Sequence, residues 1–499
     1  MQKIISAVQT RLADQFTIAN EPIASIDLME RASVAFVSRF IEEVPLKTTM
    51  IAVYCGVGNN GGDGLAIARL LAAKSYMNVK VIILQHSFKT TIDFEENLRR
   101  VQQLKLPVHI FQSEDVLPIE TSEVIIDAIL GSGLNKPLEG SLKKWVEQLN
   151  QQKKHVIAVD IPTGMFADEP NSADSVVVKT DLVISFQRPK LNFLLPESAS
   201  VIKRWHVVDI GLDEHFIQSC ESELALIEEK DIQSILKKRD NFSHKGTYGH
   251  SLIIAGQEET MGAALLTAEA CLNTGSGLTT AYVPSLGLVA LNTRLPEVMA
   301  AIGEVDKIQW EKYSAVAIGP GLGTDDHSIE ILKSTLKNFR GPCVFDADAL
   351  NVLSADSSLL DLVPEQSVLT PHVKEFDRLF GAHENWTQRV KTMQKESTER
   401  ELIIVLKNRY TLIASPTGMI YFNLTGTPAM ASGGMGDVLT GIIVSLLAQG
   451  YSAIQAAMAG VYLHGKAGNE LEELGYSVIP ASKLARRINK TIGKVRSTK

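Results

Sequence analysis

Short apolar runs that look like buried β-strands alternate with helical stretches along most of this 499-residue chain. In the first half the runs are MIAVYC, VKVIIL, PVHIF, EVIIDAIL, HVIAVDI, DLVISF and RWHVVDI, and helical stretches cover residues 61–74, 93–104 and 141–151. Strands that are joined through helices line up parallel in one sheet, with the helices on both faces. The alternation therefore predicts an α/β fold.

The alternation stops after residue 218 and starts again at residue 250. The segment between them, CESELALIEEKDIQSILKKRDNFSHKG, is charged, and we expect no strand in it. HSLIIAG, LTTAYVP, AVAIGPG, PCVFDAD, SVLTP, ELIIVLK and TLIAS follow, and TLIASPTGMIYFN is typical of a hairpin that turns at Pro-Thr-Gly. We predict two α/β domains, residues 1–220 and 221–499, with the boundary near 215–228.

Composition limits the partners of this chain. A net charge of −8 and a pI near 5.8 argue against a surface for nucleic acid or anionic lipid. The four cysteines lie far apart, which fits a reducing cytosol, and most of them stand in apolar segments where we expect burial. The apolar run VLTGIIVSLLAQ is too short for a bilayer, which needs about 20 residues, and the charged start is unlike a signal peptide. We expect a cytoplasmic protein without nucleic-acid or membrane partners.

The glycine loop in CGVGNNGGDGLAIARLL stands between a strand and a helix. Gly56, Gly58 and Gly61 satisfy the spacing of a dinucleotide-binding fingerprint, which would suit an NAD(P)-dependent dehydrogenase. Such a site also needs an acid at the end of the next strand, and that strand ends in Gln85, His86 and Ser87. The missing acid disfavours a dehydrogenase.

Oxygen-bearing side chains stand at three strand ends of the first half. Asn60 follows MIAVYC, Asp127 lies in IIDAILGSGLNKP, and Asp160 and Thr163 lie in AVDIPTG. Ligands of such sheets bind beyond the carboxyl ends of the strands, and these oxygens suit a hard cation. Taken singly, each residue is better explained as a loop cap, but together they predict a ligand site with a cation.

The segments NNGGDG, DAILGSGLNKP and DIPTG, in this order, resemble the epimerase domain of the NAD(P)H-hydrate repair enzymes over residues 10–213. The resemblance implies a Rossmann-like three-layer α/β/α domain that binds a hydrated nicotinamide nucleotide. It assigns a potassium ion to Asn60, Asp127 and Thr163. It assigns the hydrate to Asn59, Asn60, Gly61, Gly62, Asp63, Gly131, Ser132, Gly133, Leu134, Asn135, Lys136, Pro137 and Asp160.

Epimerisation of such a hydrate inverts the carbon that carries the C6 hydroxyl, through a cationic or ring-opened species. Proton transfer is needed, and a strand-end carboxylate can supply it. We take Asp160 as the acid/base group. Lys190, in SFQRPKLNF, is either its partner or a solvated lysine.

A second glycine loop, in GTPAMASGGMGDVLTGIIVSLLAQ, opens the long apolar helix of the second half. Gly433, Gly434 and Gly436 allow a sharp turn, and the helix dipole makes its start an anion site. Asp437 at that start suits a base that works beside phosphates. An ordinary N-cap would place an aspartate there too.

This GGxGD at a helix start resembles the ribokinase-like superfamily. HKGTYGHSLIIAG, MGAALLTAEA, GPGLG, FDADALN, LTPHVKEF and LKNRYTLI narrow the resemblance to the ADP- or ATP-dependent NAD(P)H-hydrate dehydratase domain, over residues 228–490. It implies that Asp437 is catalytic and that the hydrate contacts Ala263, Gly323, His372 and Asp437. It assigns the adenine nucleotide to Lys407, Asn408, Arg409, Tyr410, Thr411 and Gly436.

The resemblance implies a reaction in which nucleotide phosphate passes to the C6 hydroxyl and then leaves, which regenerates NAD(P)H. ADP is favoured over ATP as the donor, with Mg²⁺ on its phosphates. Asp346 either assists that ion or caps a strand end. Asn408 stands where the family often has glycine. His372 and Glu375 form H-x-x-E, but without a second histidine at helical spacing a metal site is disfavoured.

The substrates implied are the hydrates of NADH and NADPH together with ADP, and the resemblance implies a homo-oligomer. Two rival functions remain. A ribokinase-like small-molecule kinase would explain the second domain alone, and a non-catalytic binding role would explain the first.

Overall fold

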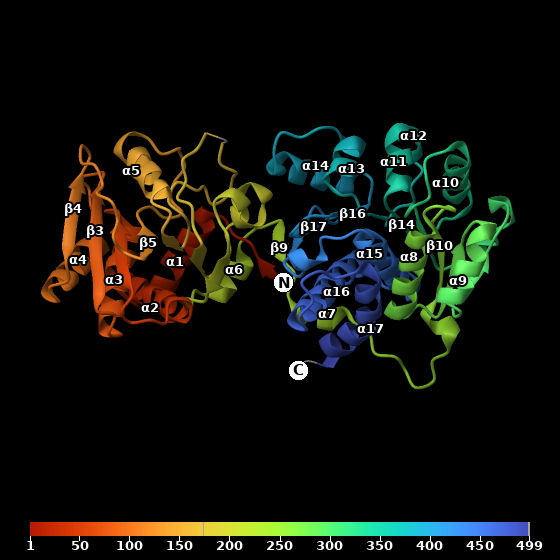
Figure 1. Cartoon of the computed structure of the whole chain (residues 1–499), viewed down its shortest axis with the longest axis horizontal. Coiled ribbons are helices and arrows are strands. Elements are labelled where there is room, and N and C mark those ends of the chain that lie inside the picture. The colour runs from red at the N-terminus through yellow and green to blue at the C-terminus, as the bar shows by residue number, and fades with distance from the viewer. Residues whose placement is uncertain (173, 498–499) are drawn as a thin grey trace. The chain divides into compact units, whose positions relative to one another are not determined.

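The computed structural model describes residues 1–172 and 174–497 (Figure 1). The chain divides into two compact units. One comprises residues 3–222, and the other comprises residues 1–2 and 223–499.

The N-terminal unit is built on a seven-stranded sheet in the order β4-β3-β2-β5-β6-β7-β8. Every neighbouring pair in it is parallel, as the alternation of strands and helices predicted. The strand order reverses between β2 and β5, and ligands of such sheets bind at this point, beyond the carboxyl ends of the strands. The strands are β2 (Met50–Cys55), β3 (Asn78–Gln85), β4 (Val108–Gln112), β5 (Val124–Ala128), β6 (His155–Val159), β7 (Leu182–Phe186) and β8 (Trp205–Val208).

Helices cover both faces of this sheet because side chains on both faces of the central strands are apolar and buried. Val53 packs with Leu65 of α3 on one face, and Tyr54 packs with Trp145 of α5 on the other. The helices are α1 (Ala7–Asn20), α2 (Ser25–Glu43), α3 (Asn59–Ala73), α4 (Ile92–Gln103), α5 (Gly140–Gln151) and α6 (Glu214–Ser219), with 3₁₀ turns at Leu191–Leu194 and Pro196–Ser200.

The C-terminal unit carries an 11-stranded sheet in the order β1-β9-β18-β17-β16-β15-β14-β13-β10-β11-β12. The run from β16 to β12 is parallel, and β16, β17 and β18 pair antiparallel, so the predicted hairpin forms. The strands are β1 (Gln2–Lys3), β9 (Leu224–Leu226), β10 (His250–Ile254), β11 (Leu278–Tyr282), β12 (Met299–Ala301), β13 (Ala315–Ile318), β14 (Cys343–Phe345), β15 (Val368–Leu369), β16 (Ile403–Leu406), β17 (Thr411–Ala414) and β18 (Ile420–Asn423).

One expectation for this region was wrong. The charged segment after residue 219 contains β9, which pairs in parallel with β18. Three residues are too few to show a strand pattern, and pairing with a neighbour far along the chain makes them a strand.

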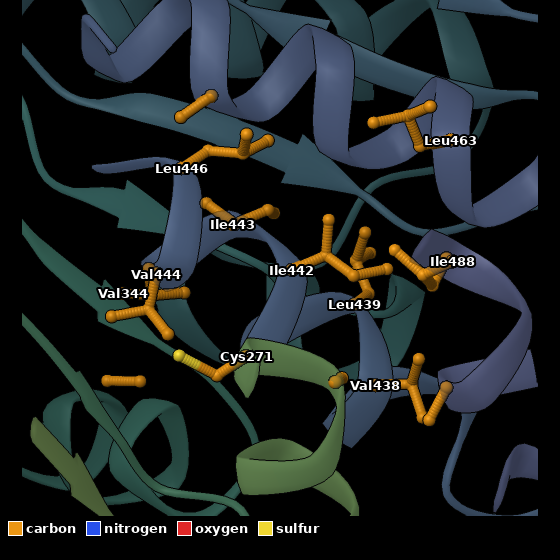
Figure 2. Close-up of a cluster of buried hydrophobic side chains, with 14 of the residues drawn as sticks. Cys271, Val344, Val438, Leu439, Ile442, Ile443, Val444, Leu446, Leu463 and Ile488 are labelled. Carbon is orange, nitrogen blue, oxygen red and sulfur yellow. The ribbon is translucent and has the colours of Figure 1, made fainter. Parts of the chain in front are cut away.

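The helix α15 (Met435–Ala448) is buried along nearly its whole length. In Figure 2 its side chains, among them Ile442 and Val444, lie between Val344 of β14, Cys271 of α8 and Ile488 of α17. A helix that is apolar on every side must lie inside the domain, and this burial fixes the position of its N-terminus. The other helices are α7 (Glu229–Ile235), α8 (Met261–Thr274), α9 (Leu288–Arg294), α10 (Asp326–Asn338), α11 (Asp348–Ala355), α12 (Ser357–Leu360), α13 (Val373–Phe380), α14 (Trp386–Glu399), α16 (Ala453–Glu473) and α17 (Ala481–Ser497).

All four cysteines are free thiols, and Cys55, Cys271 and Cys343 are buried, as their apolar surroundings in the sequence indicated. Among the helices of the described residues, none has the length and apolar character that crossing a membrane requires.

Candidate active sites

A cavity of about 670 Å³ opens in the N-terminal unit where the strand order reverses. Segments that follow β2, β5, β6, β7 and β8 line it, together with side chains of α1 and α2. Its polar lining comprises Thr10, Arg11, Asp14, Gln15, Ser25, Asn59, Asn60, Asp63, Ser132, Asp160, Gln187 and Lys190. Four of the residues predicted from NNGGDG and GSGLNKP to bind the hydrate bring polar or charged side chains to this wall, namely Asn59, Asn60, Asp63 and Ser132, and Gly131, Gly133 and Leu134 complete the loop after β5.

The first glycine loop is held close to the rest of the backbone. A β-carbon on Gly61 would lie 2.0 Å from the carbonyl oxygen of Gly56, and one on Gly56 would lie 2.0 Å from that of Ile129. Neither position admits a side chain, so the loop and the start of α3 stay at the edge of the sheet. Gly61 and Gly62 are buried in α3 and do not line the cavity, and neither do Asn135, Lys136 and Pro137.

Asp127 and Thr163 form a buried hydrogen-bonded pair beneath the cavity. Thr163 donates its Oγ1 hydroxyl to Oδ1 of Asp127 at 2.7 Å and its backbone N–H to Oδ2 at 2.8 Å. Burial raises the pKa of Asp127 to about 6 in spite of these donors, because no cation of the described residues contacts the carboxylate.

Asn60 is the third residue predicted to bind potassium. Its side chain is buried, its Nδ2 atom has no hydrogen-bond partner among the described residues, and a β-carbon on Gly131 would lie 3.6 Å from its Oδ1. The two amide atoms of an asparagine exchange places by a simple flip, which would turn an oxygen toward the unpaired position. An orphaned amide and an uncompensated carboxylate are a donor set that fits a hard cation.

Asp160 and Lys190 make a buried ion pair in the cavity wall. The Lys190 Nζ atom lies 2.8 Å from Oδ1 of Asp160, and their side chains are 3% and 13% exposed, respectively. Ser185 Oγ and the backbone N–H of Phe186 also donate to Oδ1, both at 3.1 Å. Asp160 has φ of +63°, a conformation that costs energy for a residue with a β-carbon and that recurs at functional sites. Lys190 is therefore not a solvated lysine.

In the C-terminal unit the second glycine loop turns into α15 at Gly434, whose φ is +86°. Asp437 lies in the first turn of this helix. Burial, reinforced by the nearby charge of Asp346, raises the pKa of Asp437 to about 6. Within the described residues, the Asp437 carboxylate makes no hydrogen bond or ion pair, so it is not the N-cap that the sequence left open.

Asp346 and Lys407 form a second buried ion pair, which lies beside this loop. Nζ of Lys407 lies 2.7 Å from Oδ1 of Asp346, and Thr440 of α15 donates to Oδ2 at 2.8 Å. Burial alone would raise the pKa of Asp346, but the charge of Lys407 and these donors hold it below its usual value. A β-carbon on Gly436 would lie 3.4 Å from that Nζ, so the glycine loop packs against the pair. Both oxygens of Asp346 are occupied, which favours a structural role over magnesium ligation.

The remaining residues predicted for the nucleotide and hydrate lie at the carboxyl edge of the sheet or the start of a helix. His372 is the N-cap of α13, where its Nδ1 accepts from the backbone N–H of Glu375 at 3.1 Å. The H-x-x-E pattern is thus a capping box, and no group of three or more His, Cys, Asp or Glu side chains that could hold a metal occurs among the described residues. Asn408, Arg409 and Tyr410 make the turn between β16 and β17, and Thr411 begins β17.

Ala263, in the first turn of α8, lies against the loop after β13 that carries Gly323. Gly323 donates its N–H to Asp348 at 2.9 Å, and a β-carbon on the neighbouring Gly321 would lie 3.0 Å from that of Ala263. Beside them Gln257 packs against Gly323 and lines a cavity of about 640 Å³. That cavity is not lined by Asp437, so it borders the predicted hydrate contacts rather than the predicted base.

Comparison with known proteins covers both units. A family model described as "NAD(P)H-hydrate dehydratase" matches residues 251–490, and one described as "YjeF-related protein N-terminus" matches residues 25–192. A Bifunctional NAD(P)H-hydrate repair enzyme Nnr from Moorella thermoacetica is 33% identical over 94% of this chain and 92% of its own length. The chain belongs to the bifunctional NAD(P)H-hydrate repair enzymes.

Another relative of the same name, from Escherichia coli strain K12, is 34% identical over 84% of this chain and 80% of its own length. A crystal structure of a ribokinase-like superfamily protein from Enterococcus faecalis V583 matches with a TM-score of 0.51 and 28% identity. It covers 56% of this chain and 99% of its own. These findings confirm both resemblances, the ribokinase-like fold of the second half among them.

The sequence did not indicate the contribution of α1 to the first site. Arg11 and Asp14 line the cavity from this helix, yet no motif marks them. The helical spacing of Arg11, Asp14 and Gln15 on one polar face was the only available signal, and a polar face is far more often solvated than part of a site.

Proposed function

We propose that this chain repairs hydrated nicotinamide nucleotides in two steps. The N-terminal unit interconverts the R and S epimers of the hydrates of NADH and NADPH. The C-terminal unit dehydrates the S form to NAD(P)H and converts ADP to AMP and phosphate. The observation that carries the proposal is that both halves of one chain match the same family, and that each half has an aspartate-bearing site at the carboxyl edge of a parallel sheet.

In the N-terminal unit we assign the hydrate to the cavity and the acid/base role to Asp160. Asn59, Asn60, Asp63 and residues 131–134 line this cavity, whereas Gly61, Gly62 and residues 135–137 do not and would have to reach the substrate from outside the present wall. Oδ1 of Asp160 takes the three bonds found within the described residues, which leaves Oδ2 for the substrate. Lys190 holds this carboxylate in place and compensates its charge.

Asn60, Asp127 and Thr163 fit a potassium ion, because the buried amide of Asn60 has an unpaired atom and the buried carboxylate of Asp127 has no cation beside it among the described residues. When bound, the ion would supply a fixed positive charge beside the glycine loop. Asp127 and Thr163 orient the loop after β5, because Thr163 Oγ1 also accepts from the backbone N–H of Leu130 at 2.9 Å.

In the C-terminal unit we assign proton removal to Asp437. The aspartate accepts the proton of the C6 hydroxyl while that oxygen attacks the terminal phosphorus of ADP, and AMP leaves with the electron pair of the broken P–O bond. Phosphate then departs from C6 with its bonding pair, and loss of a ring proton restores the double bond of NAD(P)H. The amide groups at the start of α15 face the developing negative charge.

The nucleotide would lie against Lys407, the turn 408–411 and Gly436, with the hydrate toward Ala263, Gly323 and His372. Mg²⁺ fits as a companion of the nucleotide phosphates rather than as an ion held by a cluster of side chains, because Asp346 is fully engaged with Lys407 and Thr440. We further propose a cytoplasmic homo-oligomer, which light scattering of the purified chain would test.

The experiment that tests the function starts from the two epimers of NADPH hydrate, separated by chromatography. With Mg²⁺ and ADP, the absorbance of reduced nicotinamide should return fully from both epimers, and phosphate should equal the NADPH formed. A parallel reaction with ATP identifies the better donor. A stable phosphorylated product without NADPH would instead identify a small-molecule kinase, and return from the S epimer alone would exclude the epimerase.

A further inference from the structure

Asp14 is an unpaired carboxylate in the wall of the N-terminal cavity. It lies on α1, is half-buried, and lines the cavity together with Asp160 and Lys190. Within the described residues its side chain makes no hydrogen bond and no ion pair, although Arg11 stands one turn before it on the same helix. A desolvated carboxyl group without a partner destabilises the fold, so its presence in a ligand cavity needs a reason.

Asp160, which lines the same cavity, differs from Asp14 in its partners. It is paired with Lys190 and accepts hydrogen bonds from Ser185 and Phe186. The cavity therefore holds one carboxylate that is fixed by donors and one, Asp14, that has no donor among the described residues. A carboxylate that is held by donors suits a base, and a carboxyl group without them suits an acid.

We propose that Asp14 is the general acid of epimer exchange and Asp160 its base; the assignment rests on the function proposed for this unit. Asp160 takes the proton of the C6 hydroxyl, and the freed electron pair of that oxygen forms a C=O bond. The C6–N1 bond breaks, and its electrons move to N1, which takes the proton of Asp14. Rotation about the C5–C6 bond turns the other face of the aldehyde to N1. The reverse transfers then close the ring as the other epimer, and both carboxyl groups recover their starting states.

The charges around Asp14 support this role. Burial, reinforced by the negative charge of Asp160, raises the pKa of Asp14 to about 6, against the opposing charges of Lys190 and Arg11. A pKa near neutrality suits a group that must both give and regain a proton. α2 and α6 pack against α1, but among the described residues none of their charged side chains lines the cavity. Several of these side chains have partners of their own: Arg31 with Glu21, Glu30 with Arg69, and Glu214 with Arg188.

Asp63, which also lines the cavity, is less suited to this exchange. It lies on α3, close to Asp14 and Asp160, and burial together with those two charges raises its pKa well above the usual value. Because the ionised form of Asp63 is disfavoured, its carboxyl group is better suited to donating a hydrogen bond than to giving up and regaining a proton in each cycle. Asp63 would position the hydrate, and Asp14 would move the proton.

The test measures exchange between separated epimers with the full-length chain, without nucleotide, so that dehydration does not intervene. Asp14→Asn should lower kcat for exchange by about 10²–10⁴-fold and change KM little. Asp14→Glu should recover part of the rate. Because an acid works only while protonated, wild-type kcat should fall as pH rises above about 6, and Asp14→Asn should lack this decline. Asp209→Asn, an exposed carboxylate of the same unit outside the cavity, should behave like wild type.

Dehydration of the pure S epimer by the C-terminal unit gives an internal control for the amount of active protein. If Asp14→Asn exchanges epimers at the wild-type rate with the same pH dependence, the inference is wrong while the proposed function stands. If the wild-type chain itself does not exchange epimers, the proposed function fails instead. Should Asp14→Asn fail to fold, Asp14→Glu decides: an unaltered position of the decline above pH 6 would overturn the assignment.

Discussion

The buried pair of Asp160 and Lys190 makes a measurable prediction about stability. Replacing Lys190 by Met keeps most of the apolar stem but leaves Asp160 as a buried charge without its counter-ion. At the observed 2.8 Å, the attraction between unit charges is about 6 kcal/mol at an effective dielectric constant of 20. Much of this offsets the desolvation of two ions, so the loss on breaking a buried pair is about 3–5 kcal/mol.

The local contacts place the two single variants within that range. Asp160 keeps the hydrogen bonds from Ser185 and Phe186, so Lys190→Met should cost about 3 kcal/mol, at the lower end. Asp160→Asn leaves a lysine whose side chain is only 3% exposed, and about 4 kcal/mol is expected. Since neither charge remains buried in the double variant, it should cost less than either single variant and much less than the sum of the two.

Hydrogen exchange on the full-length chain, followed in peptides from β6 and β7, measures these changes without assuming that the two units unfold together. The matched control is Lys203→Met, which removes a similar pair with Asp181 whose lysine is 75% exposed. That variant should lose no more than about 1 kcal/mol. If Lys190→Met costs as little as Lys203→Met, or if the two single variants simply add, burial does not govern this pair and the reasoning fails.

Three further outcomes are expected. Asp437→Asn should slow dehydration by about 10²–10⁴-fold and leave epimer exchange intact. The rate of wild-type dehydration should rise as pH increases through about 6, because a base works only when ionised. A pH-rate profile of NADPH formation checks both. Gly436→Ala should weaken ADP binding in calorimetry, since its β-carbon would lie 3.4 Å from Nζ of Lys407, whereas Gly433→Ala, with nothing within 4 Å, should bind normally. Gly61→Ala should abolish epimer exchange and lower the melting temperature of the N-terminal unit, because its β-carbon would lie 2.0 Å from a carbonyl oxygen; unchanged exchange would show that the loop can shift.

Most strands of the two sheets could be predicted because the physical requirement is local; the short strands β1, β9 and β12 could not. A central parallel strand is buried on both faces, so it appears as a continuous apolar run, and each such run in the sequence became a strand. The residues that follow these runs must meet at one edge of the sheet, which is why Asp127, Asp160 and Thr163 could be grouped from sequence alone. The first glycine loop could be predicted in the same way, since the close approach of the backbone excludes side chains at Gly56 and Gly61.

What the sequence could not supply depends on partners distant along the chain. β9 is a strand only because β18 pairs with it, and Asp14 enters the cavity only because α1 closes its wall. Lys190 looks in sequence like any lysine after a strand, and its burial follows from the position of Asp160 across the sheet edge. A local sequence pattern does not show which residues from distant parts of the chain will lie beside it in the fold.

The two units place their charges in the same way although their folds differ. The candidate site of each unit contains an aspartate bound to a lysine, Asp160 to Lys190 and Asp346 to Lys407, at 2.8 and 2.7 Å. Each also has a second aspartate that makes no hydrogen bond or ion pair within the described residues and whose pKa burial raises to about 6, Asp14 in one and Asp437 in the other. The lysine partners fix the position of the paired carboxylates, and the unpaired ones can change protonation near neutral pH at little cost. In the C-terminal unit the unpaired Asp437 moves the proton and the paired Asp346 organises the site, whereas in the N-terminal unit the paired Asp160 is the base and the unpaired Asp14 is the acid.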